Sequence, residues 1–99
     1  MSRRITVLAV CGFGVGTSLI LRMNIEKVLK ENKIDAEVIN ADVTTGTSIA
    51  CDVIFTSKEL YTLLEEKVKV PLVQINNFMS NAEIMEKGLP IIKEIIASL

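Results

Sequence analysis

Residues 5–18 read ITVLAVCGFGVGTS, a short apolar run followed at once by a loop with three glycines at alternate positions. The apolar run is rich in β-branched residues and ends abruptly at Cys11, which predicts a buried parallel strand over residues 5–10. Beyond the loop, apolar residues recur at helical spacing as far as Asn32, with charged residues between them. A strand, a glycine-rich turn and an amphipathic helix are the opening unit of an open parallel sheet.

Three more strand-sized apolar segments follow along the chain, at residues 36–39, 53–55 and 72–75. Helix-sized or polar segments separate them, and strands that alternate with helices pair in parallel. Right-handed crossovers then predict a sheet order of 2-1-3-4. The predicted fold class is therefore α/β, a three-layer sandwich of the Rossmann-like or phosphatase-like kind, with a four-stranded parallel sheet and helices on both faces.

Hydroxyl residues and one proline mark the ends of the predicted helices. Ser18 can cap the first helix, and Ser57 can cap a second helix before the fourth strand. Ser80 and Glu83 have the spacing of a capping box and open the last helix. Pro90 predicts a kink or a restart within that last helix, because a proline removes a hydrogen bond and clashes with the preceding turn.

Length, charge and composition narrow the class of protein. The 99 residues suit one domain, residues 1–99, and 49% apolar residues can fill a single core. The formal net charge is -1 and basic residues form no cluster, so we expect no nucleic-acid partner. The apolar run before Cys11 is shorter than the roughly 7 to 15 residues of an export signal. No run approaches the roughly 20 residues that span a bilayer, so we expect a cytoplasmic protein without membrane insertion.

Cysteine and histidine content limits the chemistry further. Two cysteines are too few for a secreted disulfide scaffold and indicate a reducing compartment. Histidine is absent, which excludes Cys-His and Ser-His nucleophile pairs and histidine-containing metal sites within this chain. We expect neither a metal site nor a cofactor.

The loop between the first strand and the first helix is where we expect the chemistry. This turn is the usual anion site of open parallel sheets, because alternate glycines let successive N–H groups point at one anion. The helix N-terminus adds roughly half a unit of positive charge. Both effects favour the thiolate of Cys11, which we expect to be the catalytic nucleophile. The residues expected to bind a phosphoryl group follow it: Gly12, Phe13, Gly14, Val15, Gly16, Thr17 and Ser18.

The spacing of the loop disfavours several other anion and redox motifs. It lacks the Gly-Lys-Ser/Thr of nucleotide P-loops, its glycines do not follow the dinucleotide pattern, and it is not C-x-x-C. A cysteine and five residues also resemble the phosphate loop of low-molecular-weight protein tyrosine phosphatases, but Thr17 stands where those enzymes have an arginine. Without that bidentate clamp we expect slow hydrolysis. A cysteine phosphatase, a non-catalytic regulatory domain and an inert glycine-rich turn remain as alternatives.

The whole chain resembles a IIB component of the bacterial phosphoenolpyruvate-dependent sugar phosphotransferase system, in the lactose/cellobiose to ascorbate/galactitol superfamily. The features that carry the resemblance are the strand at residues 5–10, the loop CGFGVGTS, the helix start LILRM at residues 19–23 and the strand DVIFTS at residues 52–57. The loop is most similar to that of the ascorbate-type branch, which reads C-G-x-G-x-G-[ST]-S.

This resemblance implies a phosphocarrier. Cys11 would accept a phosphoryl group from a phosphohistidine on the IIA component, with the backbone of residues 12–18 as its cradle. It would then pass the group to sugar bound by the IIC membrane component. The branch implies L-ascorbate or a related pentitol or hexitol.

Other residues have competing interpretations. We expect Cys51 to pack as a small core residue and Arg22 to be an exposed helix arginine. Leu19, Ile20 and Met23 lie partly off the apolar stripe of the first helix, which makes them either a docking patch or part of a wider buried face. Turn formation is the expected role of the asparagines after the fourth strand: Asn76, Asn77 and Asn81.

Overall fold

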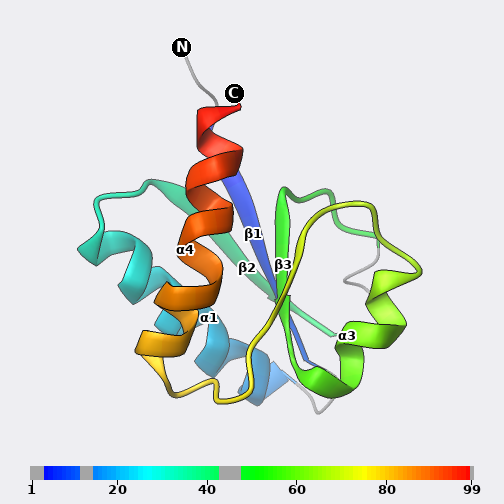
Figure 1. Cartoon of the computed structure of the whole chain (residues 1–99). Helices are drawn as coiled ribbons and strands as arrows, with labels where there is room; N and C mark the ends of the chain where they lie inside the picture. Colours follow the sequence, from blue (N-terminus) through cyan, green and yellow to red (C-terminus); the bar gives the residue numbers. More distant parts are fainter. Residues whose placement is uncertain (1–3, 12–14, 43–47, 99) are drawn as a thin grey trace.

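The computed structural model describes residues 4–11, 15–42 and 48–98, and of residues 15–18 the backbone only. Its elements follow the predicted alternation of strands and helices (Figure 1). The strands are β1 (Ile5–Val10), β2 (Ala36–Ala41), β3 (Val53–Thr56) and β4 (Leu72–Gln74). The helices are α1 (Val15–Glu31), α3 (Lys58–Glu65) and α4 (Asn81–Ala97).

The four strands form one parallel sheet in the order β2-β1-β3-β4, which confirms the predicted order 2-1-3-4. At the carboxyl edge of the sheet, Val10 at the end of β1 pairs with Ala41 on one side and with Thr56 on the other. Thr56 in turn pairs with Gln74 of β4. The two central strands therefore end level with each other, and the chain segments that follow them emerge side by side.

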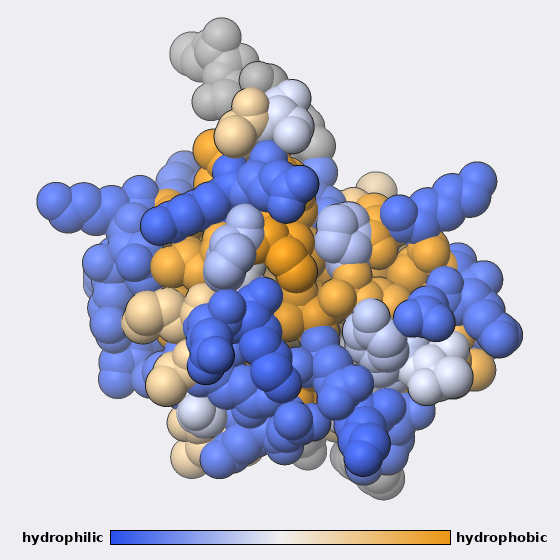
Figure 2. All heavy atoms as spheres, viewed as in Figure 1, coloured by the Kyte–Doolittle hydropathy of each residue, from blue (hydrophilic) through white to orange (hydrophobic). Residues whose placement is uncertain are grey.

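Side chains of β1 and β3 alternate between the two faces of the sheet, as the period of a strand requires. Ile5, Val7 and Ala9 pack with Val53 and Phe55 against α1 and α4. The strand residues that alternate with them, Leu8, Val10 and Ile54, pack on the other face with Leu64 of α3. Helices thus cover both faces, as predicted, and α1 and α4 lie side by side in Figure 1 with α3 apart from them. Figure 2 shows hydrophobic residues between the helices and hydrophilic residues on their outer surfaces.

Two predicted helix boundaries are wrong. The first helix begins at Val15, so Ser18 lies within its first turn and cannot be its cap. The last helix runs without interruption through Pro90, so no restart occurs. Pro90 is exposed, and water can therefore satisfy the carbonyl that loses its helical partner. No helix in the described ranges is long and apolar enough to cross a membrane.

Candidate functional site

Cys11 follows β1 at the carboxyl edge of the sheet and is 1% exposed. Its N–H donates to the carbonyl of Ala41 at 3.3 Å, so the ladder between β1 and β2 continues one residue beyond the strand. This bond fixes the backbone of the predicted nucleophile between the two neighbouring strand ends. Cys11, the predicted catalytic residue, therefore lies at the end of an inner strand, at the carboxyl edge of the sheet.

The N-terminus of α1, Val15, lies four residues beyond Cys11 along the chain. The first N–H groups of any α-helix have no partner within it, and in α1 these include the N–H groups of Val15, Gly16 and Thr17. Together with the helix dipole they favour an anion at this end. The other predicted phosphate-binding residues, Gly12, Phe13 and Gly14, lie outside the described residues, as do the side chains of Thr17 and Ser18.

Register identifies the neighbours of Cys11 at this edge. Because Val10 pairs with Ala41 and Thr56, the next residues, Asp42 and Ser57, flank Cys11. Asp42 is exposed and brings a negative charge to the edge. Sequence reasoning missed Asp42 and treated Ser57 only as a helix cap. The residue directly after each predicted parallel strand was the signal that could have found both.

Exposed apolar side chains lie along the first half of α1 and in the segment after β4. Leu19, Ile20 and Met23 are 40%, 43% and 59% exposed, so a wider buried face does not account for them. Met79, in the segment after β4, is 71% exposed. The segment is tied to α1 by the side chain of Asn24, whose Nδ2 donates to the carbonyl of Phe78 at 2.6 Å.

The side chain of Arg22 contacts Asn40 of β2 and Glu26 of α1. Its Nη1 donates to Oδ1 of Asn40 at 3.0 Å, and its Nε lies 3.4 Å from Oε1 of Glu26 without hydrogen-bond geometry. These partners lie on β2 and one turn along α1. Arg22 was predicted to be an exposed helix arginine, whereas in the structure its side chain is partly buried and is held by these contacts.

Asn76 and Asn77 form the predicted turn, which surrounds the carboxylate of Glu83, whereas Asn81 is the first residue of α4 and not part of a turn. The N–H groups of Asn76 and Asn77 each donate to Glu83 at 2.8 Å, and Lys87 Nζ lies 2.7 Å from the same side chain. Partial burial would raise the pKa of Glu83, but these donors outweigh it and hold the pKa below its usual value. Ser80 accepts from the N–H of Glu83 at 3.2 Å, which confirms its capping role.

Cys51 lies at the opposite edge of the sheet, just before β3. With the strand rise of about 3.3 Å per residue, the six residues from Cys51 to Ser57 span about 20 Å, too far for a disulfide with Cys11. Cys51 packs at the border of the core on the α3 side, beside a cavity of about 260 Å³. Burial, and then the charge of Asp52, raise the pKa of its thiol.

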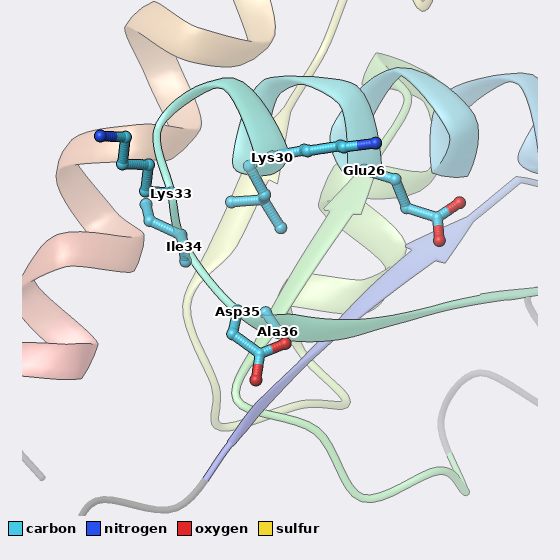
Figure 3. Close-up of a pocket in the computed structure, with 7 residues that line it drawn as sticks. Glu26, Lys30, Lys33, Ile34, Asp35 and Ala36 are labelled. Atoms are coloured by element: carbon cyan, nitrogen blue, oxygen red, sulfur yellow. The ribbon is translucent and has the colours of Figure 1, made fainter.

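A larger cavity of about 390 Å³ lies at the connection between α1 and β2, away from Cys11. Figure 3 shows Glu26 and Lys33 pointing away from each other there. Asp35 forms an ion pair with Arg4 at 3.1 Å. The charged side chains that line this cavity do not converge on a common point, so the cavity offers no catalytic arrangement. No group of three or more potential metal ligands occurs within the described ranges.

Comparison with known proteins gives consistent matches over nearly the whole chain. Residues 6–87 match the family described as "PTS system, Lactose/Cellobiose specific IIB subunit". A protein of Mycoplasma pneumoniae named "Ascorbate-specific PTS system EIIB component" is 29% identical over 86% of this chain and 92% of its own length. Proteins of the same name from Salmonella typhimurium and Escherichia coli O157:H7 are each 30% identical, over 91% of both chains.

Two solved structures share the fold. The lactose-specific IIB component domain of the phosphotransferase system from Streptococcus pneumoniae matches with a TM-score of 0.65 and 16% identity, over 96% of this chain and 97% of that one. An enzyme IIB subunit of the phosphotransferase system from Escherichia coli K12 matches with a TM-score of 0.54 and 17% identity, over 99% and 97%.

Proposed function

The chain belongs to the lactose/cellobiose-specific IIB subunit family of the sugar phosphotransferase system, and from that premise we propose that it carries a phosphoryl group on Cys11. Subunits of this family are sugar-specific components that work with IIA and IIC partners. The proposal covers residues 1–99 as one IIB domain acting in the cytoplasm.

The observation that carries the proposal is the position of Cys11. It is buried at the carboxyl edge of a parallel sheet, where ligands of open α/β folds bind. Four residues later, α1 begins at Val15, and the N–H groups of its first turn have no partner within the helix. The other cysteine, Cys51, lies at the opposite edge of the sheet, just before β3. An anion on the sulfur of Cys11 would therefore lie near a partial positive charge.

In the first transfer, the thiolate of Cys11 attacks the phosphorus of a phosphohistidine on the IIA partner. The S–P bond forms as the N–P bond breaks, and the electron pair of the N–P bond goes to the imidazole nitrogen. Where the thiol starts protonated, its proton ends on that imidazole. The backbone of residues 12–18 holds the phosphoryl oxygens during the transfer.

The second transfer takes place with sugar bound by the IIC partner. A sugar hydroxyl oxygen attacks the phosphorus, the S–P bond breaks, and its electron pair returns to sulfur as the thiolate. The proton of the hydroxyl goes to water or to a base on the IIC partner, because this chain has no histidine to receive it. No cofactor takes part in either transfer.

L-ascorbate or a related pentitol or hexitol is the proposed sugar. The relatives from three organisms bear the name of ascorbate-specific components, and the loop CGFGVGTS is similar to that branch. Growth on ascorbate of a strain that contains this chain as its sole IIB component, with the cognate IIA and IIC components, would test this assignment.

Hydrolysis is disfavoured because Thr17 occupies the position at which the phosphatases that this loop resembles have an arginine. A carrier has to retain the phosphoryl group until its acceptor arrives, so slow attack by water suits this role. Incubation with the phosphorylated IIA partner, followed by mass spectrometry at neutral pH, tests the proposal. A carrier gains one phosphoryl group on Cys11. A phosphatase would instead release inorganic phosphate from an aryl phosphate, and a regulatory domain would do neither.

A further inference from the structure

Ser57 follows β3 just as Cys11 follows β1. Val10 pairs with Thr56, so Cys11 and Ser57 occupy the next position of the same parallel register. The backbone of Ser57 is still extended, with φ -84° and ψ 167°, so the alternation of β3 continues through it. The two side chains therefore start from neighbouring backbone positions at the carboxyl edge.

Alternation also places both side chains on the same face. Ala9 and Phe55 pack on the side of α1 and α4, two residues before Cys11 and Ser57 respectively. The residues between them, Val10 and Thr56, turn toward the other side: Val10 packs with the α3 cluster, and the Thr56 hydroxyl donates to the Val10 carbonyl. Cys11 and Ser57 therefore project toward the side on which α1 begins.

The hydroxyl of Ser57 is buried and unused. The residue is 9% exposed, and its Oγ has no hydrogen-bond partner among the described residues, the sulfur of Cys11 included. Ser57 stands at the N-cap position of α3, yet its side chain makes no cap hydrogen bond. The other capping serine, Ser80, does make one, to the N–H of Glu83. A buried hydroxyl without a hydrogen-bond partner is energetically unfavourable, so a ligand that accepts a hydrogen bond from it would be stabilised at this position.

On its other side, Ser57 has no polar neighbour in the register. The pairing of Thr56 with Gln74 places Ile75 next to Ser57, and Ile75 is 1% exposed and apolar. Of the two described residues that flank Ser57 in the register, Cys11 is therefore the one whose side chain can carry a polar group. A phosphoryl group on the sulfur would add three acceptor oxygens beyond it.

We propose that Ser57 is a phosphoryl-contacting residue whose hydroxyl donates a hydrogen bond to a phosphoryl oxygen on Cys11. This inference rests on the proposed function of Cys11 as acceptor. The bond forms in the phosphorylated state, because the hydroxyl is unpartnered in the unmodified protein. Ser57 thus favours the loaded carrier over the empty one.

The test compares the equilibrium constant for phosphoryl transfer from the phosphorylated IIA partner in the wild type, Ser57→Ala and Ser57→Thr. A hydrogen bond to a charged group supports an expected loss of about tenfold for Ser57→Ala. Ser57→Thr keeps the hydroxyl and should recover most of that loss. The lifetime of the isolated phosphocysteine and its ³¹P chemical shift should change in Ser57→Ala as well.

Ser80→Ala is the matched control. It removes a cap bond that the structure shows, so it should lower the melting temperature and leave the transfer equilibrium unchanged. Ser57→Ala should instead lower the equilibrium constant for transfer and leave the melting temperature close to that of the wild type. An unchanged equilibrium constant and ³¹P shift in Ser57→Ala would overturn the role of Ser57 while leaving the carrier proposal intact. A wild-type chain that gains no phosphoryl group would overturn both.

Discussion

The hydroxyl of Thr56 donates a 3.0 Å hydrogen bond to the carbonyl of Val10, the residue directly before Cys11. Both residues are 0% exposed. The bond crosses between the two central strands at the last position of their register, immediately beneath the proposed phosphoryl acceptor. It ties the end of β1 to the end of β3, and so fixes the spacing between Cys11 and Ser57.

Thr56→Val tests this tie. Valine has nearly the shape of threonine but cannot donate, so the substitution should lower the free energy of unfolding by about 1 kcal/mol. Urea denaturation would measure the loss. Thr56→Ser is the control, because it retains the hydroxyl donor at residue 56. Equal stability of Thr56→Val and the wild type would show that the bond contributes nothing.

Gly88 lies against Phe55, the largest fully buried side chain of the core. A Cβ at residue 88 would overlap the end of the Phe55 ring. Overpacking of this kind costs about 1–3 kcal/mol, whereas alanine is favoured over glycine in a helix by about 1 kcal/mol. We expect Gly88→Ala to lower the free energy of unfolding by about 1 kcal/mol. Adding Phe55→Leu should shrink the cost of the alanine, and a gain in stability for Gly88→Ala alone would contradict the packing argument.

Glu83 makes stability depend on pH. Its pKa is lowered in the folded chain, so its contribution is complete above the unfolded pKa of about 4.3 and is lost as the pH falls through the folded pKa. Glu83→Gln keeps one acceptor oxygen, for only one of the N–H groups of Asn76 and Asn77, and has no charge to pair with Lys87. The wild type should therefore lose more stability than Glu83→Gln between pH 6 and pH 3. Parallel stability curves for the two proteins would contradict this role.

The exposed side chain of Met23 is a candidate contact for the IIA partner. It lies two turns into α1, at the midpoint of the helix, and is 59% exposed. Met23→Lys should slow transfer from the phosphorylated IIA partner roughly tenfold, which corresponds to about 1.4 kcal/mol of lost transition-state binding. Melting temperature should barely change. Ile96→Lys is the control, because Ile96 is also an exposed apolar residue but lies at the C-terminal end of α4. Equal rates for both variants would exclude Met23 from the contact.

The fold was predictable because its signals are local and repeated. Short apolar strands alternating with helix-sized segments allow few topologies, and right-handed crossovers select the order that the structure has. The continuity of the last helix was harder to predict, because Pro90 interrupts the helical pattern in sequence but faces solvent in the structure. A proline on the exposed side removes only a bond that water can replace.

The site was predictable only in part. The position of Cys11 before a glycine-rich turn identifies the nucleophile, but Ser57 satisfies the preferences of a helix cap whether or not its hydroxyl is used there. Only strand register and burial show that this hydroxyl is unpartnered beside Cys11. Likewise, the apolar residues Leu19 and Ile20 fit a buried face or an exposed patch equally well in sequence.

Transfer from the phosphorylated IIA partner to the wild type, Cys11→Ser and Cys51→Ala, followed by intact-mass spectrometry at neutral pH, tests the central claim most directly. A serine hydroxyl ionises far less readily than a thiol, so Cys11→Ser should gain no phosphoryl group while its melting temperature stays close to that of the wild type. Cys51→Ala should gain one group, as the wild type does, with at most a modest loss of stability. The account would be contradicted by a phosphoryl adduct on Cys11→Ser, or by a folded Cys51→Ala that accepts none.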